Sequence, residues 1–215
     1  YSFLGQYERA IEDYDEAIRL NPQDANAYNI RGTAYRIQGQ YERAIEDYDE
    51  AIRLNPRDAG FYHFRGATYS FLGQYERAIE DYDEAICLNP QDAGFYHDRA
   101  FSYLSLDQHE RAREDFNEAI RLNPQGAIAY HDRGSMYLRL GQCELAIQDY
   151  EEAIRLDPQY ATAYNDRGLA YRALGQYELA IQDYDEAIRL NPQYANAYNN
   201  KGAAYSFLEQ FERTI

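Results

Sequence analysis

The sequence predicts an all-α solenoid, a stack of antiparallel helix pairs, and three features of the text predict it. A unit of 34 residues returns along the chain with small edits. All 24 tyrosines fall at only five positions of that unit. All six prolines fall at a single position, namely Pro22, Pro56, Pro90, Pro124, Pro158 and Pro192. Because so short a unit cannot bury an apolar face alone, neighbouring copies must stack into one continuous core.

The bounds of the copies follow from the period, and we expect one array over residues 1–215. The chain opens midway through a copy, has no initiator Met and stops inside another copy. These features indicate a fragment of a longer array with uncapped apolar ends. The expected full copies are 25–58, 59–92, 93–126, 127–160 and 161–194, with partial copies at 1–24 and 195–215.

Composition argues against several classes of function. A formal net charge of −16 disfavours nucleic-acid binding, which needs a basic surface for phosphate. No apolar run approaches the roughly 20 residues of a membrane span, and no signal peptide is visible. Cys87 and Cys143 occupy unrelated positions of the unit, so we expect neither a disulfide nor a metal cluster. A reducing, cytoplasmic compartment fits, and we expect no cofactor.

Each copy reads as two helices joined by a short loop, so the two helices must pack antiparallel. The first spans about Asn26–Gln38 and ends at Gly39, a residue that readily adopts the left-handed conformation that closes a helix. The second spans about Tyr41–Leu54 and stops before Pro56, which cannot donate the next hydrogen bond. Three copies offer an aspartate as N-cap, at Asp24, Asp58 and Asp92.

The tyrosines are explained by packing. Tyr28, Gly32 and Tyr35 share one stripe of the first helix at i, i+4 and i+7. The matching stripe of the second helix holds Ala44, Ile45, Tyr48, Ala51 and Ile52. The glycine and alanines let the two backbones approach, and the tyrosines fill the space between neighbouring helices. Regular placement at packing positions therefore favours a core role over stacking on bases or sugars.

These residues resemble the tetratricopeptide repeat (TPR) family. The pattern is carried over the whole chain by the 34-residue unit and, in one copy, by Tyr28, Gly32, Tyr35, Gly39, Tyr41, Ala44, Tyr48, Ala51 and Pro56. The resemblance implies a right-handed superhelix in which the first helices line a concave groove and the second helices form the outside. It also implies a protein-interaction role.

One departure from the family pattern predicts an ion-pair network. Where the family usually has an apolar residue before the helix glycine, this chain has Arg31, Arg65, Arg99, Arg133, Arg167 and Lys201. The second helices carry a regularly spaced aspartate, at Asp13, Asp47, Asp81, Asp115, Asp149 and Asp183. Because a cation near a core needs a partner, we expect these cations to pair with those aspartates.

The copies differ most along one stripe of the first helix, at the positions of Asn26, Ile30, Thr33 and Ile37. This stripe lies opposite the packing stripe. The exposed face of the second helix is more constant and keeps the equivalents of Glu42 throughout. Greater variation on one exposed face than on the other favours a surface adapted to a ligand, and drift after duplication is the alternative.

The implied groove is mixed in character. Phe64, Phe71, Phe101, Leu104 and Leu138 suggest an apolar patch, while Asn29, Asn165 and Asn199 could hydrogen-bond a peptide backbone. Asp98, Asp132 and Asp166 suggest an acidic ladder suited to basic residues of an extended or helical peptide. The full candidate set is completed by Arg36, His63, His97, His131, Arg139 and Arg172.

Other activities are disfavoured by particular residues. Family members that grip the tails of heat-shock chaperones use Lys, Asn and Arg where this chain has Asn29, His63 and His97, then Thr33, Ala67 and Phe101. A zinc site shared by the three recurring histidines would need side chains to converge across about 8–10 Å between packed helices. No nucleophile with a base and no phosphate-binding glycine loop is present, so we expect no catalysis.

The fourth copy departs most from its neighbours. It has Ala100 for the packing glycine, Asp107 for the turn glycine, His109 for a tyrosine and Arg113 for a core isoleucine. Either this copy packs loosely or it opens a site to a partner.

We therefore expect a non-enzymatic scaffold that binds a peptide or protein segment along the concave face. Two alternatives stay open. The uncapped ends could associate end to end, or the array could recruit substrate for a catalytic domain outside this segment.

Overall fold

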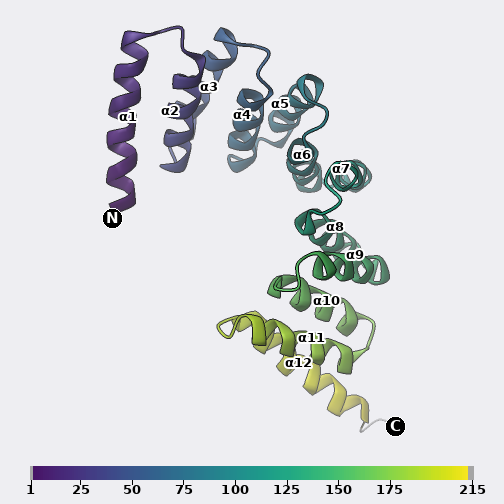
Figure 1. Cartoon of the computed structure of the whole chain (residues 1–215). Coiled ribbons are helices and arrows are strands. Elements are labelled where there is room, and N and C mark those ends of the chain that lie inside the picture. The colour runs from purple at the N-terminus through teal and green to yellow at the C-terminus, as the bar shows by residue number, and fades with distance from the viewer. Residues whose placement is uncertain (1, 213–215) are drawn as a thin grey trace. The chain divides into compact units, whose positions relative to one another are not determined.

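The computed structural model describes residues 2–212, and these residues form helices joined by short loops, with no strand among them (Figure 1). The all-α prediction is confirmed. The helices are α1 (Ser2–Leu20), α2 (Ala25–Ile37), α3 (Tyr41–Leu54), α4 (Ala59–Phe71), α5 (Tyr75–Leu88), α6 (Ala93–Ser105), α7 (His109–Leu122), α8 (Ala127–Arg139), α9 (Cys143–Leu156), α10 (Ala161–Ala173), α11 (Tyr177–Leu190) and α12 (Ala195–Glu212).

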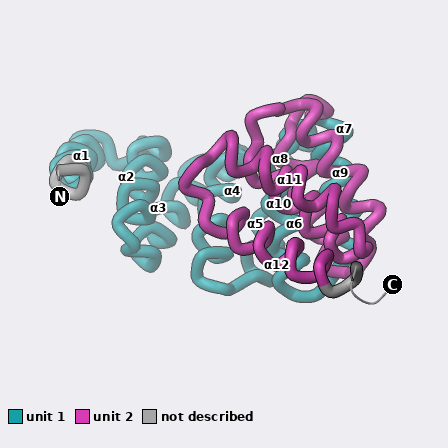
Figure 2. The backbone as a smooth tube through the Cα atoms, turned by 90° about the horizontal axis from the view of Figure 1, so that it is seen from below, with its two compact units in different colours: residues 1–122 teal, residues 123–215 magenta. Residues whose placement is uncertain are grey.

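The helices fall into two compact units, which Figure 2 colours separately. Unit 1 spans Tyr1–Leu122 and holds α1 to α7, and unit 2 spans Asn123–Ile215 and holds α8 to α12. Within each unit every helix packs on its neighbour in the sequence. The first helices of successive repeats also contact each other, α2 with α4 and α4 with α6 in unit 1, and α8 with α10 and α10 with α12 in unit 2. We call these first helices the inner layer of each unit.

The predicted helix ends are confirmed to within a residue. Asp24 caps α2, because its Oδ1 accepts hydrogen bonds from Asn26 N at 3.0 Å and Ala27 N at 3.3 Å. After α2, Gly39 takes the left-handed conformation with φ +76° and turns the chain into α3. The equivalent turn after α6 uses Asp107 with φ 56°, which is the only non-glycine residue with positive φ in the described chain. The repeat bounds named above stay a prediction.

The interior of each repeat is built from small residues and one large ring. Ala44, Tyr48 and Ala51 of α3 are fully buried. On α2, a Cβ added to Gly32 would lie 3.0 Å from the Tyr48 ring and 3.1 Å from the carbonyl oxygen of Ala44. Glycine is therefore required for this separation of the two backbones, because any larger side chain must push the ring or the helix away.

The predicted ion pairs are confirmed for the five arginines, whereas Lys201 contacts Asp185 and none of the predicted aspartates. Arg31 Nε and Nη2 donate to the two carboxylate oxygens of Asp47 at 2.8 and 2.6 Å, and Nη1 donates to Asp15 of the preceding repeat at 2.6 Å. The same bidentate contact recurs as Arg65–Asp81, Arg99–Asp115, Arg133–Asp149 and Arg167–Asp183. In unit 1 each of these arginines thus joins the two helices of its own repeat to the second helix before it.

The glycine contact predicts opposite effects of one substitution at two sites of unit 2. A Cβ at Gly168 would lie 2.6 Å from the buried Tyr184 ring, whereas a Cβ at Gly202 would meet no atom within 4 Å. We expect Gly168→Ala to lower the free energy of unfolding by about 1–2 kcal/mol through overpacking. We expect Gly202→Ala to raise it by up to about 1 kcal/mol through helix propensity. Urea unfolding measures both, and equal effects would refute the packing argument.

The ion pairs predict that removing one partner costs more than removing both. Burial raises the pKa of Asp81, and the hydrogen bonds from Arg65 oppose that rise. Arg65→Met leaves the buried carboxylate without its partner, so we expect a loss of about 3 kcal/mol in unfolding free energy. The double variant Arg65→Met/Asp81→Leu should recover most of that loss. A double variant as unstable as the single one in urea unfolding would contradict this account.

Candidate functional site

The variable stripe of the first helices lies on the exposed side of the inner layer. In α2, Ile30 and Ile37 are 45% and 50% exposed, although both are large apolar residues. Thr33, between them, donates its hydroxyl to Asn29 O at 3.0 Å and lies 3.2 Å from the hydroxyl of Tyr48. The inner layer therefore presents apolar side chains to solvent above a floor of hydroxyl groups.

In unit 1 this surface contains a pocket of about 410 Å³. Its two most exposed apolar walls are Phe71 of α4 and Phe101 of α6, at 66% and 42% exposure. The lining comes from α4, α5 and α6, through Ala67, Ser70, Phe71, Tyr75, Tyr82, Asp98, Phe101, Ser102 and Ser105. Of the candidate residues named from the sequence, the structure brings Phe71, Asp98 and Phe101 together here.

Both aromatic walls are held in place by neighbouring rings. Phe71 stacks on Tyr41 of α3, with ring centroids 6.2 Å apart and an interplanar angle of 7°. The guanidinium of Arg36 lies 5.9 Å from the centroid of the same Phe71 ring. Phe101 meets Phe116 of α7 edge to face, with centroids 5.7 Å apart. These contacts fix the rings before any ligand arrives, which lowers the entropy cost of binding.

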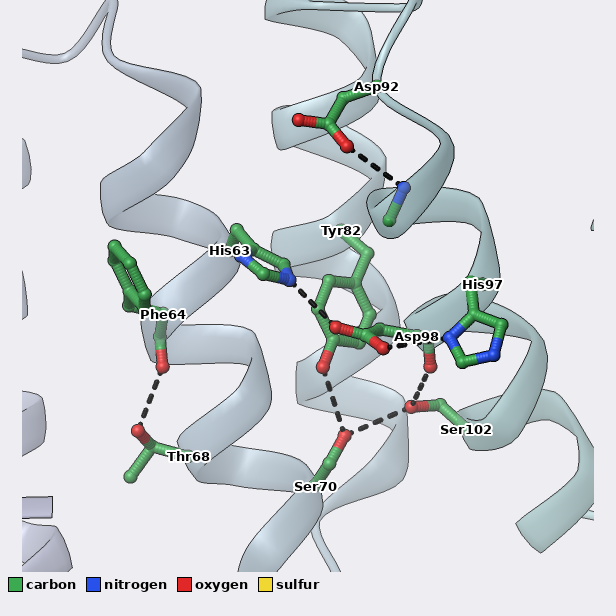
Figure 3. A network of polar contacts seen from close by, with 10 residues as sticks. His63, Phe64, Thr68, Ser70, Tyr82, Asp92, His97, Asp98 and Ser102 are labelled. Atoms are coloured by element: carbon green, nitrogen blue, oxygen red, sulfur yellow. Dashed lines mark hydrogen bonds and ion pairs between the residues drawn. The ribbon is translucent and has the colours of Figure 1, made fainter. Parts of the chain in front are cut away.

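The floor of the pocket is a short chain of hydroxyl groups, seen in Figure 3. Ser70 Oγ of α4 lies 3.0 Å from Ser102 Oγ of α6 and 3.4 Å from the hydroxyl of Tyr82. Burial raises the pKa of Tyr82, so the phenol stays neutral at physiological pH. The floor therefore carries no charge, and Ser70 is its half-buried member, whereas Ser102 and Tyr82 are each 1% exposed.

Asp98 lines one side of this pocket and lies between two histidines, His63 and His97 (Figure 3). Its carboxylate oxygens lie 2.7 Å from His63 Nε2 of the preceding first helix and 3.3 Å from His97 Nδ1. Burial alone would raise the pKa of Asp98, but the hydrogen bonds and charge of the two histidines outweigh it and lower the pKa to about 2. The carboxylate thus stays ionised while its hydrogen-bonding capacity is largely used within the chain.

Unit 2 repeats this arrangement between successive first helices. His131 Nε2 lies 2.9 Å from Asp166 Oδ2, and its Nδ1 lies 3.0 Å from Asp132 Oδ1. One repeat further on, Asn165 accepts from Asn200 Nδ2 at 2.9 Å and donates to Asp166 at 2.9 Å. The recurring polar residues of the first helices are therefore cross-links between repeats.

These pairs correct the expectation of a free acidic ladder. Asp98, Asp132 and Asp166 each have a histidine partner within the chain. Their charge is offset where each histidine is protonated, so they do not form an open row of anions. Among the residues that the structure describes, no group of three or more His, Cys, Asp or Glu side chains could hold a metal ion.

Burial corrects three further candidates. Leu104, His131 and Asn165 are 7%, 8% and 3% exposed, so a peptide cannot reach them. For Asn165 and His131 the reason is the cross-link just described.

The remaining candidates divide into packing and exposed residues. Phe64 stacks on Tyr48 with ring centroids 6.3 Å apart, and Leu138 packs on the cluster around Tyr150. Arg139 and Asn199 are exposed, and Arg36 and Arg172 are half-buried. Asn29 is half-buried as well, and its Oδ1 is buried without a hydrogen-bond partner, as is Nε of Arg36.

Sequence reasoning missed most of the pocket floor. Ser70, Ser102 and Ser105 gave no signal of their own, and Tyr75 and Tyr82 stand at packing positions shared by many copies. A signal did exist in the repeats, because Ser70 replaces Arg36 and Leu104 at its position and so leaves space between two first helices.

The unusual residues of the fourth copy differ in their burial. Ala100 is fully buried, Arg113 is exposed, and Nδ1 of His109 is buried without a hydrogen-bond partner among the described residues. Arginine replaces isoleucine at a position that is only partly buried in α3 and α5, so its charge reaches solvent.

Family comparisons agree with the helix pairs. Models described as "Tetratricopeptide repeat" match residues 1–59, 59–92 and 93–125, and one described as "TPR repeat" matches 134–174 and 168–206. The chain belongs to the tetratricopeptide repeat family. A search of curated protein sequences finds no match to it.

Solved structures with the same fold include three that cover most of this chain. A MamA protein is 27% identical with a TM-score of 0.70, over 80% of this chain and 93% of that one. YrrB is 23% identical with a TM-score of 0.69, over 89% and 99%. A tetratricopeptide repeat protein from Parabacteroides merdae ATCC 43184 is 23% identical with a TM-score of 0.78, over 98% and 82%. Fold and family support a protein-interaction scaffold. No helix in the described range is long and apolar enough to cross a membrane.

The His131 cross-link predicts a pH-dependent contribution to stability. Burial alone would lower the pKa of His131, but hydrogen bonds to Asp132 and Asp166 raise it from 6.5 to about 9. The contribution is therefore complete below pH 6.5 and is lost as the pH rises through about 9. Its full size is on the order of 3 kcal/mol.

We expect His131→Asn to abolish this pH dependence. Asparagine is accommodated at the same position in the next repeat, as Asn165 shows. The facing phenols stay neutral over the range, because burial raises the pKa of Tyr150 and brings that of Tyr160 to about 12. Urea unfolding gives the free energy of unfolding of the wild type and of the variant at about pH 6 and about pH 9.5. The wild type should be the more stable protein at pH 6, and its advantage should shrink by roughly 2–3 kcal/mol at pH 9.5. If the difference in unfolding free energy between the wild type and His131→Asn is the same at both pH values, His131 is neutral in the folded protein.

Proposed function

We propose that the chain is a non-enzymatic scaffold that binds a peptide segment of a partner protein along the inner layer of unit 1. The observation that carries the proposal is the pocket between Phe71 and Phe101, which leaves two large rings exposed on a rigid surface. Exposed aromatic residues in a concave pocket are typical anchor sites of interfaces. YrrB, which shares the fold, is described as having an unusual peptide-binding site, in line with this proposal.

The chemistry of the pocket defines the segment that fits. An apolar or aromatic side chain would lie between the two rings, and a hydroxyl at its tip could reach Ser70, which is half-buried. Asn29 Oδ1 and Arg36 Nε are buried without hydrogen-bond partners, so they have no role in the proposed binding of the segment. Basic residues opposite the aspartates are not part of the proposal, because those carboxylates already pair with histidines.

The proposal also covers catalysis and the cellular compartment. We assign no catalytic role to the chain, in keeping with its family. We place it in a reducing compartment such as the cytoplasm, a proposal supported by the free thiols of Cys87 and Cys143. Recruitment of a substrate to a catalytic domain elsewhere in a longer protein would use the same surface.

Selection from a displayed peptide library tests the proposal. We expect the selected peptides to share one aromatic or large aliphatic residue. The variant Phe71→Ser/Phe101→Ser should bind them at least tenfold more weakly in calorimetry, which corresponds to about 1.4 kcal/mol. Serine stands at both equivalent positions in other repeats, at Ser105 and Ser135, so the fold should tolerate it.

The chain offers a matched control for this experiment. Phe207 of α12 occupies the repeat position of Phe71, stacks on Tyr177 with centroids 5.9 Å apart and is 48% exposed. Phe207→Ser should leave binding unchanged, because it removes an equivalent exposed ring from outside the pocket. Equal loss in both variants, or peptides without a large apolar residue, would contradict the proposal.

A further inference from the structure

The hydroxyl groups on the floor of the pocket form a chain that ends on a backbone carbonyl (Figure 3). Ser70 Oγ lies 3.4 Å from the Tyr82 hydroxyl and 3.0 Å from Ser102 Oγ. Ser102 Oγ in turn donates to the carbonyl oxygen of Asp98 at 3.4 Å. Each hydroxyl group has one proton to donate and two lone pairs that can accept. The direction of each bond in the chain therefore follows from where the protons find acceptors.

Only one direction gives every proton of this chain an acceptor among the described residues. The phenol of Tyr82 is 1% exposed and has Ser70 Oγ as its partner, so it donates to Ser70. Ser70 then donates to Ser102, and Ser102 donates to the Asp98 carbonyl. Any other direction leaves a proton of the floor without an acceptor within the chain, which is unfavourable in a buried setting.

This direction leaves Ser70 as a hydrogen-bond acceptor. Its proton is used on Ser102, and one of its two lone pairs remains. Ser70 is half-buried and lines the pocket, whereas Ser102 and Tyr82 are each 1% exposed. Ser105, an exposed serine of the same lining, also uses its proton within the chain, because it donates to Phe101 O at 3.0 Å. The tip of a bound side chain therefore meets acceptors at both serines.

Charge in the pocket favours a neutral donor. The low pKa of Asp98, about 2, keeps its carboxylate ionised in the lining, so an anionic tip would be repelled. An ammonium tip would bring three protons to the single lone pair of Ser70. The Asp98 carboxylate is a poor second acceptor for it, because its oxygens already lie 2.7 Å from His63 and 3.3 Å from His97. A neutral tip avoids both costs of burying charge.

The walls select the body of the side chain. Phe71 and Phe101 are exposed rings that are held in place by neighbouring rings, so a flat aromatic ring packs between them. Tyrosine carries a neutral donor at the far end of such a ring. Phenylalanine and leucine have no donor, and the N–H group of tryptophan projects from the side of its ring and not from its end.

We propose that the segment bound by this pocket is anchored by a tyrosine whose phenol donates its proton to Ser70 Oγ. The inference rests on the proposed function, which requires a large apolar residue at this place, and it names that residue. It also gives the site a form of regulation. Phosphorylation of the anchor tyrosine removes the donated proton and adds negative charge beside Asp98, so the modified segment is released.

Calorimetry on the whole chain tests the proposal with one library-selected peptide. The peptide is synthesised with tyrosine, phenylalanine, 4-fluorophenylalanine, 4-aminophenylalanine or phosphotyrosine at the anchor position. The fluorine is close in size to a hydroxyl but donates no proton, whereas the neutral amine donates. We expect the tyrosine and amine peptides to bind about threefold to tenfold more tightly than the phenylalanine and fluorine peptides. The phosphotyrosine peptide should bind at least about tenfold more weakly than the tyrosine peptide.

The variant Ser70→Ala assigns the effect to one hydroxyl. It should bind the tyrosine and phenylalanine peptides equally, and its unchanged affinity for the phenylalanine peptide shows that the pocket is intact. Ser206→Ala is the matched control. Ser206 occupies the repeat position of Ser70, is exposed on α12 and donates to Gly202 O at 3.1 Å. Its removal should leave the preference for tyrosine unchanged, because it lies outside the pocket lining.

The failure of this proposal can be told apart from failure of the proposed function. Equal affinity of the wild type for the tyrosine and phenylalanine peptides would overturn the tyrosine anchor and leave peptide binding in place. A tyrosine preference that survives Ser70→Ala would also overturn it, and would place the phenol against another hydroxyl such as that of Tyr75. Tighter binding of the phosphotyrosine peptide would show that the floor donates. Selected peptides that bind Phe71→Ser/Phe101→Ser as well as wild type would end both proposals.

Discussion

The contact between a tyrosine ring on the second helix and a glycine on its partner first helix sets the spacing of four helix pairs, at Gly32, Gly66, Gly134 and Gly168. In the α6–α7 pair, Ala100 and Phe116 stand at these two positions, and both are fully buried. A Cβ built on Gly32 would lie 3.0 Å from the Tyr48 ring and 3.1 Å from the carbonyl oxygen of Ala44. The absence of a side chain at Gly32 therefore lets both the ring and the backbone of α3 approach α2. At that separation Arg31 reaches Asp47 with two parallel hydrogen bonds. Close backbones, buried rings and bidentate ion pairs are thus one geometric solution that recurs with the period of the sequence.

Polar residues of the inner layer add a second set of bonds in the direction of stacking. His63 reaches Asp98 across one repeat junction, and His131 and Asn165 do the same in unit 2. In a stack where each repeat contacts mainly its neighbours, such bonds strengthen the interfaces between repeats. They also determine which part of the variable surface is open to solvent, because the carboxylates are paired within the chain, whereas the rings of Phe71 and Phe101 are exposed.

Much of the fold followed from the sequence because the determining interactions are local and repeated. Asp24, Gly39 and Pro56 mark helix ends by backbone chemistry alone, and the arginine–aspartate pairs follow from the need of a half-buried cation for a partner. The site was predicted only in part. Asp98 and Asn165 were assigned to a ligand because the one-repeat spacing that joins them to His63 and Asn200 is a tertiary contact. The pocket itself depends on a small residue, Ser70, whose effect appears only when α4 lies beside α6.

We propose that the inner layer of unit 1 receives a partner segment, whereas the remaining regular features maintain the stack. A crystal structure of the chain with a selected peptide tests it most directly. We expect the peptide to follow the first helices, with one apolar side chain between Phe71 and Phe101 and its tip above Ser70. A peptide bound to the outer surface of the second helices, with the pocket empty, would contradict the claim.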